Sequence, residues 1–270
     1  MMDATRRSPR LRFGPTGPEP GARVLAAEVA VALSFNGTTQ AVMMATPADL
    51  EDFATGFALT EGLASLDEIL SLDVVEAGQG LDVQGWLVPE AEARLAARRR
   101  HMAGPVGCGL CGIESIEAAL CEPAPVPHGA FRLSPRQVSE AAAALGAAQR
   151  LHEETRAAHG AAFWSGGRIM ALREDVGRHN ALDKLAGWAA RAGVDPASGA
   201  VVMTSRVSID LVQKVARMGC GVLIAMSAPT AAAVDLAEHL GVTLICNARG
   251  AWFDLYSHSD RVTTEVQDAG

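Results

Sequence analysis

Apolar and polar positions alternate regularly along the second half of the chain. Short apolar runs, typical of buried strands, are separated by segments whose apolar residues recur at helical spacing. In chain order, the predicted elements are a hairpin over 161–172, a helix over 177–191, a strand over 200–204, a helix over 207–218, a strand over 221–226, a helix over 230–240 and a strand over 242–246. This alternation predicts a parallel sheet with helices packed on it.

The first half of the chain has a more mixed pattern. Asn36-Gly37, between two apolar runs, predicts a tight hairpin. From Thr46 onward, a hydroxyl, a proline and an acidic residue predict the start of a helix that ends near Gly62. The other predicted elements are strands over 24–33 and 39–45, short strands over 67–88, a helix over 89–100, and a long helix that opens with a capping box at 134–137 and ends near 157.

Prolines between residues 122 and 127 mark the best candidate for a domain boundary. We therefore expect a smaller N-terminal α+β domain over residues 22–125 and an α/β domain over residues 126–266. Residues 1–21 are rich in Arg, Pro and Gly and lack the apolar segment of a secretory signal. We expect them to form a disordered tail.

Composition narrows the class of protein. The 270 residues include 23 basic and 31 acidic side chains, and the net charge of −8 argues against a nucleic-acid groove as the main function. The odd number of cysteines, 5, indicates reduced thiols. No apolar run approaches the roughly 20 residues of a membrane span. We expect a soluble, cytoplasmic protein that binds neither nucleic acid nor a membrane.

Polar segments follow three of the predicted strands and open the next helices. Open α/β sheets bind ligands beyond the carboxyl ends of their strands, where helix N-termini offer free N–H groups to phosphates. Arg173, Arg178 and Arg206 could supply counter-charge. Each loop alone fits an ordinary helix cap, but together they favour an anionic, nucleotide-like ligand, although no Walker or Rossmann glycine motif is present. The three segments are 173–180, 205–208 and 227–230.

Two side chains near these loops also have simpler interpretations. His179 can serve as a polar group at the start of its helix. Lys184 lies one turn after Asn180 and can extend from an exposed face into solvent. Neither residue by itself indicates catalysis.

The segment from Gly104 to Gly112 places Cys108 and Cys111 among glycines and a proline, which predicts a mobile loop. Structural zinc needs four protein ligands, and a zinc deaminase needs an upstream His-x-Glu; neither accompanies the pair. A thioredoxin-like couple opens a helix without this glycine content. Nucleophilic sulfur handling, in which a thiolate accepts sulfane sulfur as a persulfide, fits best, although Cys-x-x-Cys alone is a modest signal.

Several blocks of sequence, which follow one another in the same order as in the family, resemble the FdhD/NarQ family of formate dehydrogenase accessory sulfurtransferases. The resemblance extends from about Val31 to Val262. The blocks are Asn36-Gly37, Met44 to Asp52, Gly56-Phe57 through Gly62, Gly107 to Gly112, Arg173 to Lys184, Ser205 to Ser208 and Ser227 to Thr230.

The resemblance implies a cytidine-deaminase-like three-layer fold without catalytic zinc for the C-terminal part. It implies a sulfur carrier between a cysteine desulfurase and the molybdenum cofactor, a bis-molybdopterin guanine dinucleotide, of the formate dehydrogenase apoenzyme. Cys108 would carry the persulfide and Cys111 would assist. The alternative is a chaperone that binds this guanine-nucleotide-containing cofactor and hands it on. No permanent metal is expected, and a homodimer is compatible with the family.

The resemblance also places a cofactor-binding stretch after the last parallel strand. This chain departs from the family there, since Asn247 stands where Phe is usual and Trp252 where Arg is usual, while Arg249 is retained. Ser205-Arg206 also lacks a glycine often found between these two residues. The implied cofactor-binding residues are Asn247, Ala248, Arg249, Gly250, Ala251, Trp252, Arg206, Ser205, Arg178 and His179.

Overall fold

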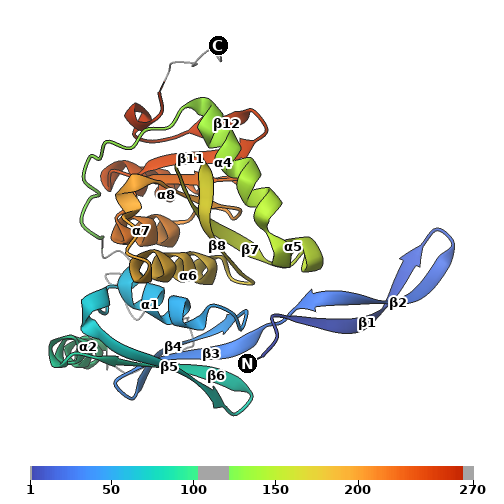
Figure 1. Ribbon diagram of the computed structural model, residues 1–270, viewed down its shortest axis with the longest axis horizontal. Coiled ribbons are helices and arrows are strands. Elements are labelled where there is room, and N and C mark those ends of the chain that lie inside the picture. The colour runs from blue at the N-terminus through green and yellow to red at the C-terminus, as the bar shows by residue number, and fades with distance from the viewer. Residues whose placement is uncertain (1, 103–121, 264–270) are drawn as a thin grey trace.

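A computed structural model describes residues 2–102 and 122–263 of the chain. Its strands form a six-stranded sheet, a four-stranded sheet and a two-stranded ribbon. Figure 1 shows the two larger sheets on opposite sides of a central helical layer, which contains α1 (Leu50–Thr60) and α6 (Arg178–Arg191). The described helices include none that is both long enough and apolar enough to cross a membrane.

The six-stranded sheet has the order β12-β11-β10-β9-β7-β8. Strands β9, β10 and β11 are parallel neighbours, whereas β7, β8 and β12 join by antiparallel pairing. Their bounds are β7 (His159–Ser165), β8 (Arg168–Asp175), β9 (Ala200–Met203), β10 (Val222–Ala225), β11 (Thr243–Arg249) and β12 (Trp252–Leu255). The predicted series of alternating strands and helices is thus confirmed in order and type.

Helices cover both faces of this sheet. Val201 and Met203 of β9 pack with α6, α7 (Ile209–Met218) and α8 (Ala231–His239) on one face. The intervening Ala200 and Val202 pack with α4 (Pro135–Ala148) on the other face. This alternation follows from the period of two along a strand and gives three layers. The finer expectation of a cytidine-deaminase-like fold stays a prediction.

The four-stranded sheet has the order β4-β3-β6-β5 and is covered by helices on one face. Its strands are β3 (Val29–Phe35), β4 (Thr38–Ala45), β5 (Ile69–Ala77) and β6 (Gly80–Leu87). The covering helices are α1 and α2 (Pro89–Met102). Val31, Leu33 and Val83 point into a core shared with Phe53 of α1. The opposite face stays exposed. The proposed boundary near residue 125 stays a prediction.

Residues 5–26 form a two-stranded ribbon, β1 (Thr5–Gly14) and β2 (Gly17–Ala26), in continuous antiparallel register. The expectation of a disordered tail over residues 1–21 is therefore wrong. Composition suggested disorder because the segment has too little apolar surface for a core of its own. The alternation Arg10-Leu11-Arg12-Phe13 is, however, a strand pattern, and the two strands satisfy each other's backbone groups without a core.

Two of the predicted local signals are confirmed. Asn36 and Gly37 adopt φ values of 48° and 71°, as a type I′ hairpin turn requires. Ser134 accepts a hydrogen bond from the N–H of Gln137, whose side chain in turn accepts from the N–H of Ser134.

Two predicted helix boundaries are wrong. The first helix begins at Leu50, not after Thr46, because the backbone of Thr46 is held in hydrogen bonds to Asp175 and Lys184. The helix expected to continue to residue 157 ends at Ala148 and resumes as α5 (Arg150–Thr155). The carboxylate of Glu174 accepts the N–H groups of two residues in the first turn of α5, which stabilises this separate start.

The two larger units join through a close crossing of α1 and α6. A Cβ atom added at Gly56 would fall well inside van der Waals contact with the backbone of Asp183, and one at Gly187 would do so with the backbone of Asp52. Only glycine permits this approach. The crossing holds the four-stranded sheet against the start of α6, which lies beside the candidate site.

Candidate functional site

The carboxyl ends of the parallel strands meet at one edge of the six-stranded sheet, here called the strand-end edge. The N–H of Met226, after β10, donates to the carbonyl of Met203 (2.9 Å), and the N–H of Asn247 donates to the carbonyl of Ser227 (3.1 Å). Strand β8 runs in the same direction as β9 because both are antiparallel to β7, so the loop after Asp175 reaches this edge too. The prediction that the three polar loops share one edge is confirmed.

Three arginines near this edge are available to bind an anionic ligand. Arg206 and Arg249 are exposed, and Arg178 is half-buried at the first position of α6. Among residues 2–102 and 122–263, none of the three takes part in an ion pair. Charge at a helix N-terminus and free guanidinium groups together favour phosphate.

The hydroxyl groups of these polar loops are mostly engaged within the loops. Ser205 is buried and its hydroxyl donates to the carbonyl of Arg206 (3.1 Å). Thr230 caps α8 by accepting the N–H of Ala233 (3.2 Å), so the ordinary helix-cap interpretation is correct there. The side chain of Ser208 makes no capping hydrogen bond to α7, which leaves the first N–H groups of that helix without a side-chain cap.

His179 is neutral at physiological pH. Burial, followed by the positive charge of Arg178, lowers its pKa from 6.5 to about 4. Its Nε2 atom is buried without a hydrogen-bond partner among the described residues and lies 3.8 Å from a carboxylate oxygen of Asp210. The neutral His179 side chain can therefore form a hydrogen bond with a ligand at the start of α6, but it does not add positive charge.

We expect His179 to make the protein less stable as the pH falls from about 6.5 to about 4. In this window the unfolded chain binds a proton that the folded chain does not, so unfolding is favoured by up to about 3 kcal/mol. His179→Gln should remove this part of the pH dependence. Urea unfolding from pH 7 to pH 4 would measure it, with the exposed His239→Gln as control. Equal pH slopes for the wild type and His179→Gln would contradict the expectation.

The predicted cofactor stretch, residues 247–252, comprises the bulged end of β11, the turn that follows it and the first residue of β12. Asn247 adopts a φ of 53° and its amide donates to Asp254 (2.7 Å), while Ala248 is buried. Trp252 is 83% exposed and is paired across the turn with Arg249. The turn thus presents one large aromatic surface next to one cation, at the strand-end edge.

Arg173 is not available to a ligand, contrary to the sequence prediction. Its guanidinium binds Asp52 through Nε (2.9 Å) and through Nη2 (2.7 Å). Arg191 binds the other oxygen of the same carboxylate (2.7 Å). These contacts connect the two larger units, so Arg173 serves the interface between them.

Lys184 is also placed differently from the prediction. It is fully buried, 2.6 Å from Asp175, and also donates to the carbonyl of Thr46 (2.9 Å). Asp175 further accepts hydrogen bonds from the N–H of Thr46 (3.0 Å) and from the amide of Asn180 (2.9 Å). Much of the sequence block 173–184 thus builds the interface, and only Arg178 and His179 remain for a ligand.

A second buried cluster lies on the same interface and was missed in the sequence. Lys214 of α7 contacts Asp183 (2.9 Å), Glu61 (2.8 Å) and the hydroxyl of Thr60 (3.0 Å). Burial by itself would lower the pKa of Lys214, but Asp183 and Glu61 outweigh burial and hold it above the ordinary value. The signal was a lysine among core-facing positions of an amphipathic helix, since Leu211, Val215 and Lys214 are all buried.

The candidate thiols Cys108 and Cys111 lie outside the described residues, as does Cys121. Cys220 and Cys246 are buried, free cysteines. Burial raises the pKa of Cys220 to about 11 and that of Cys246 to about 12. Both described thiols are therefore protonated and unreactive at physiological pH.

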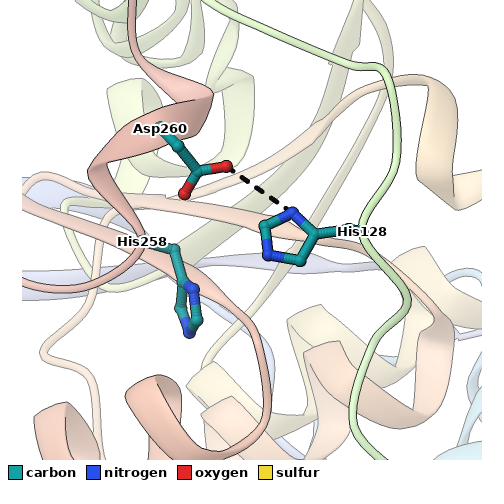
Figure 2. A group of neighbouring side chains, drawn as sticks. All are labelled: His128, His258 and Asp260. Atoms are coloured by element: carbon teal, nitrogen blue, oxygen red, sulfur yellow. Dashed lines mark ion pairs between the residues drawn. The ribbon is translucent and has the colours of Figure 1, made fainter.

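One cluster in the described part of the chain has the residue types of a metal site. Figure 2 shows His128, His258 and Asp260, whose ligand atoms lie within 4.8 Å of one another. Asp260 also faces Arg132 (3.9 Å), and His258 Nε2 is hydrogen-bonded to the carbonyl of Glu238 (2.8 Å). The cluster lies near the start of β11, at the opposite edge from the candidate site, since Thr243 donates to the carbonyl of His258. We interpret it as a surface network that holds the segment around residue 128.

The family model and the two relatives described here, to which this chain is similar, all carry the FdhD name. The model of the FdhD/NarQ family matches residues 26–263. A sulfur carrier protein FdhD from Agrobacterium fabrum is 50% identical over 259 residues, covering 95% of this chain and 96% of that protein. The sulfur carrier protein FdhD from Cupriavidus necator is 46% identical over 244 residues, covering 90% of this chain and 84% of that protein.

A solved structure shares the fold. The crystal structure of a protein described as a formate dehydrogenase accessory protein, from Desulfotalea psychrophila, matches with a TM-score of 0.76. The match covers 96% of this chain and 100% of that chain at 22% sequence identity. It therefore supports the mixed α/β architecture described above.

Proposed function

This chain belongs to the FdhD/NarQ family, and from that premise we propose that it is a sulfur carrier that serves a formate dehydrogenase. The observation that carries the proposal is the near-full-length likeness to proteins named as sulfur carriers. A sulfur carrier needs a thiol that can form a thiolate and a surface that binds the acceptor of the sulfur.

We infer that Cys108 carries the sulfur as a persulfide and that Cys111 assists. Their glycine-rich sequence suits a thiol that must visit both a donor and an acceptor. The raised pKa values of Cys220 and Cys246 support this choice, because a protonated, buried thiol does not act as a nucleophile.

The proposed transfer begins with a persulfide on the cysteine of a desulfurase. The Cys108 thiolate attacks the outer sulfur atom, the sulfur–sulfur bond breaks, and the desulfurase cysteine leaves as a thiolate. Cys108 now holds the persulfide, so one sulfur atom has moved and no oxidant is consumed. The loaded Cys108 then delivers this sulfur to the molybdenum cofactor, which is cargo rather than a resident group.

The strand-end edge is the proposed binding surface for that cofactor. A bis-molybdopterin guanine dinucleotide offers phosphates and a flat base. Arg178, Arg206 and Arg249 suit the phosphates, and the exposed Trp252 offers a face on which a base can stack. The indole replaces the cation that family members usually carry there, so stacking takes the place of one phosphate contact. The remaining members of the proposed set, Asn247, Ala248, Gly250, Ala251, Ser205 and His179, shape the surface around these four.

Intact-mass analysis after incubation with a cysteine desulfurase and cysteine tests the proposal. We expect a gain of one sulfur atom that a reductant removes, and we expect Cys108→Ala to lose at least nine-tenths of it. Cys246→Ala is the matched control and should load like the wild type. A Cys108→Ala protein that still loads fully would overturn the assignment of the carrier.

The alternative is a chaperone that binds and hands over the cofactor without carrying sulfur. The free arginines at the strand-end edge would serve this role equally well. Maturation of a formate dehydrogenase with a Cys108→Ala, Cys111→Ala variant separates the two. If the protein is a sulfur carrier, the dehydrogenase matured with this variant should be inactive. If the protein is a pure chaperone, that dehydrogenase should be active.

A further inference from the structure

The surface network of His128, His258 and Asp260 has the donor set of a metal site. Two imidazoles and one carboxylate are good ligands for zinc and other divalent transition ions. Figure 2 shows the three side chains gathered where the segment around residue 128 passes the short helical turn η3 (Ser259–Arg261). Among the described residues, this is the one group of three such side chains whose ligand atoms all lie within 4.8 Å of one another.

The spacing of two of the ligand atoms already suits an ion. Nδ1 of His128 lies 3.6 Å from Oδ2 of Asp260, a contact drawn as the dashed line in Figure 2. Two ligands at about 2.0–2.2 Å from a tetrahedral zinc ion lie roughly 3.3–3.6 Å from each other. The His128 and Asp260 side chains are 65% and 48% exposed, so they can rotate toward His258 to complete the set.

A hydrogen bond of His258 determines which of its ring nitrogens can bind the ion. Its Nε2 atom lies 2.8 Å from the carbonyl oxygen of Glu238. A carbonyl only accepts, so Nε2 carries the proton and the lone pair of the neutral ring lies on Nδ1. Nδ1 has no hydrogen-bond partner in the part of the chain that the structure describes. Histidines that ligate metals usually donate their other N–H to a carbonyl or a carboxylate in this way, which orients the ring.

The backbone that carries these ligands is fixed without any ion. Two residues before His128, the N–H of Val126 donates to the carbonyl of Leu240 (2.8 Å). The carbonyl of His258 accepts a hydrogen bond from the hydroxyl of Thr243 in β11 (2.9 Å). Binding an ion would therefore order side chains rather than backbone, which lowers its entropic cost.

Arg132 is a competing cation beside the site. Its Nη2 atom lies 3.9 Å from Oδ2 of Asp260. Its Nη1 atom donates to the carbonyls of Gly129 (2.7 Å) and Phe131 (3.0 Å), so the guanidinium is held mainly by its own segment. The carboxylate of Asp260 thus stays open to an ion, although the nearby positive charge lowers the affinity for it.

We propose that His128, His258 and Asp260 form a zinc site in which a water molecule takes the fourth position. The ion ties the segment that leads into α4 to the segment that follows β12. Without zinc, the same side chains form the surface network described above. The site lies at the edge of the sheet opposite the strand-end edge, so it is structural and separate from the proposed sulfur transfer. Its exposed ligands and the charge of Arg132 make the ion exchangeable.

Isothermal titration calorimetry with zinc chloride tests the site. The full chain is used as the variant C108S/C111S/C121S, because these thiols could bind zinc themselves. We expect one zinc ion per chain in this background. Adding any one of the substitutions His128→Gln, His258→Gln and Asp260→Asn should raise the Kd for zinc at least tenfold.

Two further variants in the same background serve as controls. His239→Gln should leave the Kd unchanged, because His239 is exposed and pairs with Glu122 (3.1 Å) outside the cluster. Arg132→Gln removes the competing charge and should bind zinc at least as tightly as the parent. No saturable binding to the parent, or a Kd that all three ligand substitutions leave unchanged, would overturn the proposal.

Hydrogen–deuterium exchange with and without zinc locates the bound ion. Zinc should slow the exchange of amides in peptides that cover residues 127–132 and 256–261, because the ion ties these segments together. Asp260→Asn should abolish this protection. Protection that is confined to peptides elsewhere in the chain would contradict the proposed site.

Discussion

Replacing Gly187 with alanine is expected to destabilise the protein by about 3 kcal/mol or more, a cost at the upper end for overpacking. The added Cβ would collide with backbone atoms of Asp52 in α1, and backbone cannot move aside as a flexible side chain can. The same argument holds for Gly56, whose Cβ would meet the backbone of Asp183. Relief would require α1 and α6 to separate, which would also stretch the ion pairs across the interface.

A matched control exists in another helix. Gly146 lies within α4, and a Cβ there would make ordinary contact with Met226 at 3.9 Å. Gly146→Ala should be neutral or stabilise the protein by roughly 0.5–1 kcal/mol, because glycine is a poor helix former. Urea unfolding curves of both variants measure the difference. If Gly187→Ala is as well tolerated as Gly146→Ala, the two helices do not cross as closely as described.

Replacing Lys184 with methionine is expected to cost about 3–5 kcal/mol. The substitution leaves the carboxylate of Asp175 buried in the interface without its cation, and a buried, unpaired charge is costly. The hydrogen bonds to Asp175 from Thr46 and Asn180 would remain but would not replace the lost charge. Urea unfolding at neutral pH measures this loss.

The double variant Asp175→Asn, Lys184→Met distinguishes the stability lost through the unpaired charge from the stability lost through altered packing. It removes both charges, so we expect it to recover at least half of the stability lost by Lys184→Met alone. Arg136→Met is the surface control, because Arg136 and Glu140 form an exposed pair on α4 that should contribute less than about 0.5 kcal/mol. A similar, small effect of Lys184→Met and Arg136→Met would contradict a buried pair.

These two predictions concern the same interface, and the interface bears on function. Asp175 and Lys184 fix the turn that leads to Arg178 and His179, while the crossing of α1 and α6 fixes the axis of the helix that carries both. A loosened interface should therefore alter ligand binding at the strand-end edge as well as stability.

Local signals allowed elements of both larger units to be predicted from the sequence. The Asn36-Gly37 turn and the Ser134 capping box act within four residues, so their structural outcome is encoded locally. The alternation of strands and helices in the second half also predicted that the polar loops share one edge. The two-stranded ribbon was missed because low apolar content was given more weight than the alternation in Arg10 to Phe13.

The sequence by itself determined the order of the elements in the second half, the shared strand-end edge and the family. Only the tertiary structure decided which charged residues near that edge are available to a ligand. Arg173 and Lys184 have the same local sequence character as Arg178, but the first two meet Asp52 and Asp175. Arg173 and Asp52 are 121 residues apart in the chain, and Lys184 is buried beside Asp175 where Thr46, 138 residues before Lys184, packs against both. Long-range contacts of this kind leave no periodic signal, because burial of a charge depends on what packs against it.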